Sequence, residues 1–193
     1  CDVGLALFAG AFAGPTVPTN FTGNTVTGAG APNSSIGFYI STTALGFGTT
    51  DTWATLQGNE LKNNVDGVWV EEQQPPFFPL DQSKNVILTG ALNDIHDNTG
   101  NGVNVQAAAD SGLVNLDGNK IYNNGGAFPG SGFLNNGAAT LPVSSVCTWW
   151  DSITGPLAGT NPGGLGNQIS GASPVAYKPW AANAALTPVA IYP

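Results

Sequence analysis

The sequence predicts an all-β domain, a single-stranded right-handed parallel β-helix that ends in a C-terminal cap rich in aromatic residues and proline. Three observations lead to this prediction: two short patterns that recur in the same order, short segments of alternating apolar and polar residues, and very little charge. No segment shows the apolar period of an amphipathic helix together with end caps.

Two short patterns recur along the chain. The first is an Asn followed by a polar residue and an aliphatic one, and it lies in residues 22–26, 57–61, 91–95 and 117–121. The second is a Gly followed by a hydrophobic residue, a variable residue and usually another aliphatic one, in residues 37–40, 67–70, 102–105 and 132–135. Stretches rich in Asn and Gly separate the two patterns. This order predicts a repeating unit of strand, Asn/Gly turn, Gly and strand.

The Asn residues of the first pattern are the predicted turn and ladder residues: Asn24, Asn59, Asn93 and Asn119. They are 35, 34 and 26 residues apart, so the predicted coils differ in length. A β-sandwich also consists of short strands, but it does not require the same patterns in the same order. In a solenoid each coil stacks on the previous one at about 4.8 Å, and turn Asn side chains stack into ladders. The repeats therefore favour the solenoid.

The repeats resemble the pectate-lyase-like right-handed β-helix repeat, in which G-N-x-I is followed by N-x-x-x-G-V-x-V. Four C-terminal segments also follow a pattern: residues 146–151, 161–164, 166–171 and 175–180. They are similar to the terminal coil and cap of secreted bacterial and archaeal β-helix proteins, whose usual motifs are N-N-W-W-G, N-P-G-G, G-D-x-V-S-G and Y-x-P-W-L. This chain has Asp151 where Gly is usual and Asn167 where Asp is usual. The resemblance covers roughly residues 20–182 and implies the fold more than a function.

The predicted domain organisation follows from these segments. Residues 1–145 are expected to form the coils, with loop excursions near 71–84 and 126–142, and residues 146–193 the terminal coil, cap and tail. The aromatic residues expected to close the end of the apolar interior are Trp149, Trp150, Tyr177 and Trp180. A cap is needed because the last coil would otherwise expose unpaired backbone groups. A Trp pair that stacks on sugar is the alternative.

Two cysteines and two glycosylation sequons suit a protein outside the cell. Cys1 and Cys147 are disulfide candidates, within one chain or between chains. A buried Cys147 thiol and a lipidated Cys1 are the alternatives. Asn20 and Asn33 each begin an Asn-x-Ser/Thr sequon and are glycosylation candidates. The expected localisation is therefore secreted or cell-surface.

The charge excludes some partners. Only 8% of the residues are charged, against roughly 25% in an ordinary globular domain. The formal net charge is −8 and Arg is absent, so the chain cannot form the basic surface that nucleic acid or an anionic membrane requires. No run of 18 apolar residues occurs, and membrane insertion is not expected.

The densest polar cluster is Asp94, His96 and Asp97, which contains the only His. On a strand, Asp94 and His96 share a face, which is compatible with acid–base chemistry or a metal. An exposed polar turn at a coil corner is the alternative. The motifs of β-helix lyases and galacturonases, nucleophile elbows and zinc spacings are missing, so the chain is not expected to be an enzyme. No cofactor is expected, although Ca²⁺ could bind stacked Asp and Asn turns.

These observations lead to an expected extracellular structural protein, a filament, sheath or surface-layer subunit that associates with itself head to tail. The N-terminal coil lacks an evident polar cap, which leaves it available for strand addition. The alternatives are a carbohydrate-binding or polysaccharide-cleaving module and the C-terminal part of a larger adhesin.

Overall fold

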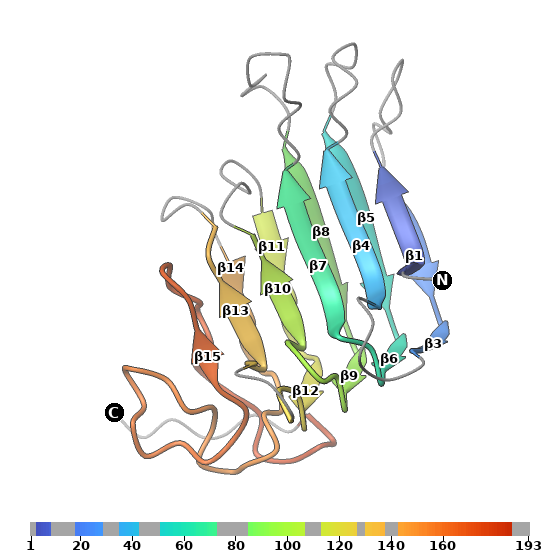
Figure 1. The fold of residues 1–193 in the computed structure, drawn as a ribbon. Helices are drawn as coiled ribbons and strands as arrows, with labels where there is room; N and C mark the ends of the chain where they lie inside the picture. Colours follow the sequence, from blue (N-terminus) through green and yellow to red (C-terminus); the bar gives the residue numbers. More distant parts are fainter. Residues whose placement is uncertain are drawn as a thin grey trace.

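The computed structural model confirms the predicted all-β fold: it is a parallel β-solenoid (Figure 1). The structure describes residues 3–8, 18–28, 35–42, 51–72, 85–106, 113–126, 130–137 and 143–186. Within these ranges there is no helix. The chain visits three sheets in rotation, and within the described residues these sheets contain six, five and four strands.

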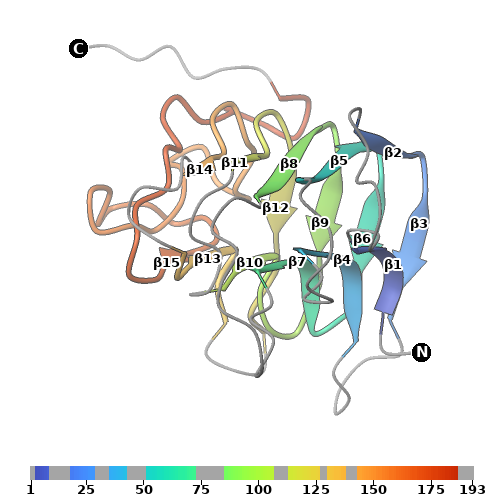
Figure 2. The same ribbon diagram turned by 90° about the horizontal axis from the view of Figure 1, so that it is seen from above.

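All the paired strands are parallel, and we name the sheets A, B and C. Sheet A contains, in spatial order, β1 (Val3–Phe8), β4 (Ile36–Thr42), β7 (Asp66–Glu72), β10 (Val103–Val105), β13 (Phe133–Asn135) and β15 (Ile169–Ser170). Sheet B contains β2 (Thr19–Thr22), β5 (Thr52–Gln57), β8 (Val86–Ala91), β11 (Leu113–Asn115) and β14 (Val143–Ser144). Sheet C contains β3 (Thr25–Thr27), β6 (Glu60–Lys62), β9 (Asp94–His96) and β12 (Lys120–Tyr122). Seen from above, sheets A and B lie on opposite sides with sheet C between them (Figure 2).

The core is a set of apolar columns that run along the solenoid. Side chains alternate between the two faces of a strand, so every second residue points inward. In sheet C, Leu61, Ile95 and Ile121 stand in register on successive turns and are fully buried. In sheet A, Phe38 and Val68 pair in the same way. Stacking in register therefore gives each turn a dry interior although the turn itself is small.

The four predicted turn Asn residues lie in one ladder between sheets B and C. The Nδ2 groups of Asn24, Asn59 and Asn93 donate to the Oδ1 of the next Asn over 2.9, 2.9 and 2.8 Å. Each Oδ1 also accepts the backbone N–H of the previous ladder residue. Because Asn59, Asn93 and Asn119 are buried, these bonds satisfy polar groups that water does not reach. At its C-terminal end the ladder meets Thr148 Oγ1.

A second ladder, between sheets C and A, did not emerge from the sequence patterns. Its members are Asn64, Asn98, Asn124 and Asn167. The second ladder also explains why the second sequence pattern begins with Gly. A Cβ on Gly67 would lie 2.6 Å from Gly102 O and 3.0 Å from Asn98 Nδ2, so no side chain fits beside the ladder.

Some predicted boundaries change. β4 and β7 are the longest described strands, with seven residues each. β7 continues through Glu72, into the expected 71–84 excursion, and residues 73–84 lie outside the described ranges. β13 lies inside the expected 126–142 excursion because the buried Phe133 continues the column of Val103.

Residues 150–186 form an irregular layer over the last turn, at the opposite end of the solenoid from β1 and β3 (Figure 1). Its segment 176–181 bonds to the chain after β14: Ser145 N donates to Ala176 O over 2.7 Å, and Ala181 N to Thr148 O over 3.0 Å. The two ends of the solenoid therefore have different structures.

Candidate functional site

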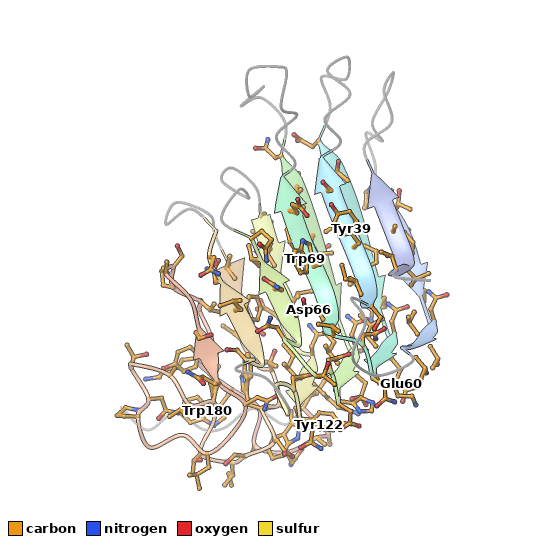
Figure 3. The ribbon with its side chains drawn as sticks, in the orientation of Figure 1. Tyr39, Glu60, Asp66, Trp69, Tyr122 and Trp180 are labelled. Carbon is orange, nitrogen blue, oxygen red and sulfur yellow. The ribbon has the colours of Figure 1, made fainter. Side chains whose placement is uncertain are left out.

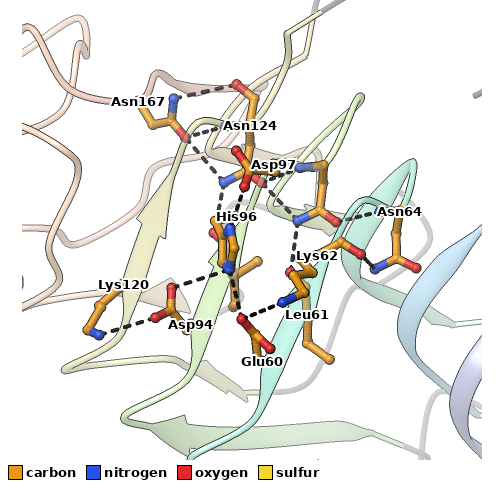
Figure 4. Close-up of polar contacts among 12 residues, drawn as sticks. Glu60, Leu61, Lys62, Asn64, Asp94, His96, Asp97, Lys120, Asn124 and Asn167 are labelled. Atoms are coloured by element: carbon orange, nitrogen blue, oxygen red, sulfur yellow. Dashed lines mark hydrogen bonds and ion pairs between the residues drawn. The ribbon is translucent and has the colours of Figure 1, made fainter. Parts of the chain in front are cut away.

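Two outward-facing polar clusters and the two ends of the solenoid are the candidate functional surfaces. The first cluster lies on sheet C and contains the predicted Asp94, His96 and Asp97 (Figure 4). The register places Glu60 and Lys120 beside Asp94 on the neighbouring turns, and Lys62 and Tyr122 beside His96. These side chains point outward because the residue between each pair, such as Ile95, points into the core. We call these seven residues the sheet C cluster.

His96 is the centre of the sheet C cluster. Its Nδ1 lies 2.7 Å from Asp97 Oδ2, and its Nε2 lies 3.4 Å from Glu60 Oε1 and 3.9 Å from Asp94 Oδ1. The Tyr122 ring stacks on the imidazole with centroids 4.9 Å apart and planes 3° from parallel. Only 11% of the His96 side chain is exposed. Asp97 has a φ of 54°, the left-handed conformation that Asn63 and Asn123 adopt at the equivalent corners.

The remaining charges of the sheet C cluster pair with one another. Lys62 Nζ lies 2.8 Å from Glu60 Oε1, and Lys120 Nζ lies 3.1 Å from Asp94 Oδ2. The hydrogen bond from Lys62 lowers the pKa of Glu60, with a smaller contribution from His96, against the opposing effect of burial. Burial, reinforced by the nearby Asp94 carboxylate, raises the pKa of Tyr122 well above its usual range. With its charges already paired, this cluster fits the alternative reading, a polar surface at a coil corner.

A cation site at stacked acidic turns requires several oxygen or nitrogen ligands around one point. Among the described residues, no group of three or more His, Cys, Asp or Glu side chains is arranged to hold a metal ion.

A second polar cluster, on the outward face of sheet A, was not among the predicted site residues (Figure 3). Tyr39, Trp69 and Asn104 stand in register on β4, β7 and β10, and each is the variable residue of the second sequence pattern. The Tyr39 hydroxyl and Trp69 Nε1 both donate to Glu71 Oε2, over 3.0 and 2.9 Å. Gln106 follows β10 and lies beside Glu71, since its N–H donates to Val70 O over 2.9 Å. Because the third position of the second sequence pattern is polar or aromatic in these three repeats, it could have revealed this cluster from the sequence.

Asp66, at the start of β7, extends the sheet A cluster below the surface. It is only 3% exposed, and its Oδ1 accepts the backbone N–H and Nδ2 of Asn101, both over 2.8 Å. Asn104 Nδ2 donates to Asp66 Oδ2 over 3.3 Å, and Asn104 Oδ1 in turn accepts from Gln106. The groups that donate hydrogen bonds to Asp66 and Glu71 are therefore all neutral. On sheet C, in contrast, Lys side chains donate to the carboxylates.

The N-terminal end of the solenoid exposes part of its apolar interior. Its inward residues Leu5, Leu7, Phe21 and Val26 pack against the core but are only half-buried. β1, β2 and β3 are the edge strands of sheets A, B and C. This end therefore presents three strand edges around a partly open core.

The C-terminal end is closed over the core but carries apolar groups outside. Of the predicted aromatic residues, Trp150 is fully buried and Tyr177 is 6% exposed, while Trp149 and Trp180 are half-buried. The Tyr177 and Trp180 rings stack with centroids 6.3 Å apart. The large apolar side chains exposed in this layer are Ile153 at 66%, Leu157 at 41% and Leu165 at 81%.

The same layer contains a shallow pocket of about 200 Å³, lined by residues that include Thr160, Ser170, Val175 and Tyr177. No charged residue lines this pocket. Its lining therefore offers hydroxyl groups but no charged side chain to a ligand.

Of the residues predicted to form a disulfide or to carry a glycan, the structure describes only some. Cys147 is half-buried and unpaired within the described ranges. Asn20 is exposed on β2, on the outward face of sheet B. Cys1 and Asn33 lie outside the described residues.

Comparison of the chain with protein-family models, curated proteins and solved structures finds no match. Within the described part of the chain, no helix has the length and apolar character to cross a membrane.

Proposed function

We propose that this chain is an extracellular structural protein that assembles head to tail through the two ends of its solenoid. The observation that carries the proposal is the difference between the ends: strand edges and half-buried apolar residues at one, a closed layer with exposed apolar residues at the other. Such unlike surfaces form heterologous contacts, which repeat along a filament when the rotation does not close a ring.

The N-terminal end has the character of an association surface. A solenoid edge offers unpaired N–H and C=O groups as a template for another strand. Leu5, Phe21 and Val26 would each lose their remaining exposed surface on contact. Apolar burial contributes about 25 cal/mol per Å², so covering this end would favour association.

The Asn ladder that begins at Asn24 gives the N-terminal end of the solenoid a defined hydrogen-bonding direction. Asn24 Nδ2 and N–H donate to Asn59 Oδ1, which leaves Asn24 Oδ1 as the acceptor at the N-terminal end of the described ladder. Two N-terminal ends that meet face to face would bring two acceptors together. The ladder therefore favours contact with a surface that supplies donors, and so head-to-tail over head-to-head association.

The C-terminal layer offers a surface for the other side of the contact. Ile153, Leu157 and Leu165 belong to one hydrogen-bonded unit, because Leu157 N donates to Gly166 O over 3.3 Å and Leu165 N to Thr154 Oγ1 over 3.0 Å. Exposed apolar groups gathered in one segment are typical of interaction surfaces.

The C-terminal likeness to secreted β-helix proteins, together with the scarcity of charge, supports an extracellular location for this assembly. Neutral Asn, Thr and Gly dominate the repeats, and such short side chains suit stacked coils. A glycan on the exposed Asn20 would project from sheet B and leave both ends of the solenoid free.

Sedimentation velocity and electron microscopy of the purified protein test the proposal. We expect concentration-dependent oligomers or filaments that are lost in Val26→Lys and in Leu165→Lys, one variant for each end. Leu165 is 81% exposed, so its variant keeps the fold even if Val26→Lys does not. Leu92→Lys is the matched control, because Leu92 is 60% exposed but follows β8 on the side of the solenoid. A wild-type protein that stays monomeric at all concentrations would contradict the proposal.

A further inference from the structure

Glu71 carries a negative charge that the described residues do not neutralise. Its partners are the Tyr39 hydroxyl and Trp69 Nε1, two neutral donors that both bind Oε2. Within the described ranges, Glu71 forms no ion pair and its Oε1 accepts no hydrogen bond. The two aromatic donors come from neighbouring turns, so they fix the carboxylate in one position on the outward face of sheet A, where Trp69 and Glu71 are half-buried and Tyr39 is buried.

A second acceptor lies next to this carboxylate. Gln106 is the neighbour of Glu71 on the following turn, one strand spacing away, or about 4.8 Å. Gln106 Nε2 donates to Asn104 Oδ1, and within the described part of the chain the amide oxygen of Gln106 accepts no hydrogen bond. Glu71 and Gln106 thus present two oxygen acceptors side by side, with the Trp69 indole adjacent.

We propose that Glu71, Gln106 and Trp69 form a binding site for an organic cation, an alkylammonium or guanidinium group. Two adjacent acceptors, one of them charged, match a group that carries several N–H donors and a positive charge. The indole N–H of Trp69 holds the carboxylate in place, so that its second oxygen is directed to the ligand. The net charge of −8 attracts cations to the molecule as a whole.

The comparison with sheet C supports this assignment. There Glu60 and Asp94 already have their own cations, Lys62 and Lys120, within 3.1 Å. The chain contains no Arg and four Lys, of which Lys178 lies over the Tyr177 ring and Lys84 lies outside the described residues. Within the described ranges no Lys is left for Glu71, and the site that we propose would take its cation from the Lys or Arg side chain of another polypeptide or from a free amine.

NMR titration of the ¹⁵N-labelled full chain tests the site directly. The Trp69 indole N–H signal, assigned with Trp69→Phe, is followed during addition of N-acetyl-arginine methylamide, N-acetyl-lysine methylamide, spermidine or a neutral methyl glucoside. We expect the cations to shift this signal and the glucoside to leave it unchanged. A stronger response to the amino-acid amides than to spermidine identifies a polypeptide source, and the reverse identifies a free amine.

Matched variants make the outcome decisive. Glu71→Gln keeps an acceptor for Tyr39 and Trp69 but removes the charge, and we expect it to weaken cation binding by about tenfold or more. Glu60→Gln removes a carboxylate that Lys62 already neutralises, and we expect binding to stay unchanged. Equal losses in the two variants, no shift with any cation, or a shift with the glucoside alone would overturn the proposal.

Discussion

Asn93 donates its side-chain amide to Asn119 Oδ1 over 2.8 Å at a position where neither residue is exposed to solvent. Asn93 also accepts the backbone N–H and Nδ2 of Asn59, and its Nδ2 donates to Leu56 O. One side chain thus joins three consecutive turns. Removing it leaves buried donors and acceptors without partners on both sides.

We therefore expect Asn93→Ala to lower the free energy of unfolding by about 3 kcal/mol, since each unsatisfied buried polar group costs about 1–3 kcal/mol. Urea denaturation followed by circular dichroism measures the change. Asn24→Ala is the control: Asn24 is half-buried and ends the described ladder, so we expect a loss of about 1 kcal/mol. Equal losses at the two positions would show that the ladder does not stabilise the interior.

Gly67 occupies a position that admits no side chain. An added Cβ would lie 2.6 Å from both Gly102 O and Ile95 Cγ2, and backbone on the next turn cannot move aside without disturbing the ladder of Asn64 and Asn98. We expect Gly67→Ala to destabilise the fold by about 2 kcal/mol, as overpacking of a dense core does. The midpoint of urea unfolding measures this change.

Gly163→Ala provides the comparison for Gly67. Nothing lies within 4 Å of a Cβ added at Gly163, and its φ is outside the left-handed region. We expect its unfolding midpoint to match the wild type. A Gly67→Ala protein as stable as Gly163→Ala would show that the turns can separate without cost.

The first ladder could be predicted from sequence because each of its Asn residues precedes an aliphatic residue that points inward. The second could not, because two of its turns, Asn63-Asn64 and Asn123-Asn124, contain two adjacent Asn residues, and its other members follow Asp97 and Gly166. Asn63 takes a positive φ while Asn64 points inward, and nothing in the sequence distinguishes the two roles. Outward residues such as Trp69 and Glu71 show no hydrophobic period, so only the register between turns brings them together with Gln106.

Lys62 sets the acidity of Glu60. The hydrogen bond from Lys62 is the largest cause of the lowered Glu60 pKa, so we expect Lys62→Gln to raise that pKa toward the usual range of a glutamate. Carboxyl ¹³C NMR titration measures it. Since a lowered folded pKa stabilises the fold above the unfolded value, this contribution is lost as the pH falls through the folded pKa. A Glu60 pKa unchanged by Lys62→Gln would contradict the assignment of the cause.

Tyr122 makes the stability of the fold sensitive to alkali. Its pKa is raised by burial first and by Asp94 second, so the folded protein retains the phenol proton at a pH where the unfolded chain releases it. The contribution is fully present below about pH 10, the unfolded value, and declines as the pH rises toward the folded pKa. We expect the melting temperature of the wild type to fall more steeply between pH 9 and 11 than that of Tyr122→Phe. Parallel curves for the two proteins would contradict this role.

The solenoid geometry decides which disulfide Cys1 and Cys147 can form. Cys147 follows β14, which lies four strand positions from β2 in sheet B, or about 19 Å along the axis at the usual 4.8 Å spacing. Cys1 precedes Val3 of β1 by two residues, a span of about 7 Å at most. Since bridged Cα atoms lie about 4.4–6.8 Å apart, we expect no bond between Cys1 and Cys147 of one chain.

We therefore expect any Cys1–Cys147 bond to join two chains, as head-to-tail association would allow. Gel electrophoresis of the native protein without reducing agent should show dimers and higher oligomers that collapse to a monomer on reduction. Cys147→Ser should remove them, while Ser145→Ala, a change two residues away at a buried position, should not. A monomer in both the oxidised and reduced lanes would exclude the covalent link. It would not exclude the non-covalent contact, which sedimentation velocity of Cys147→Ser measures separately.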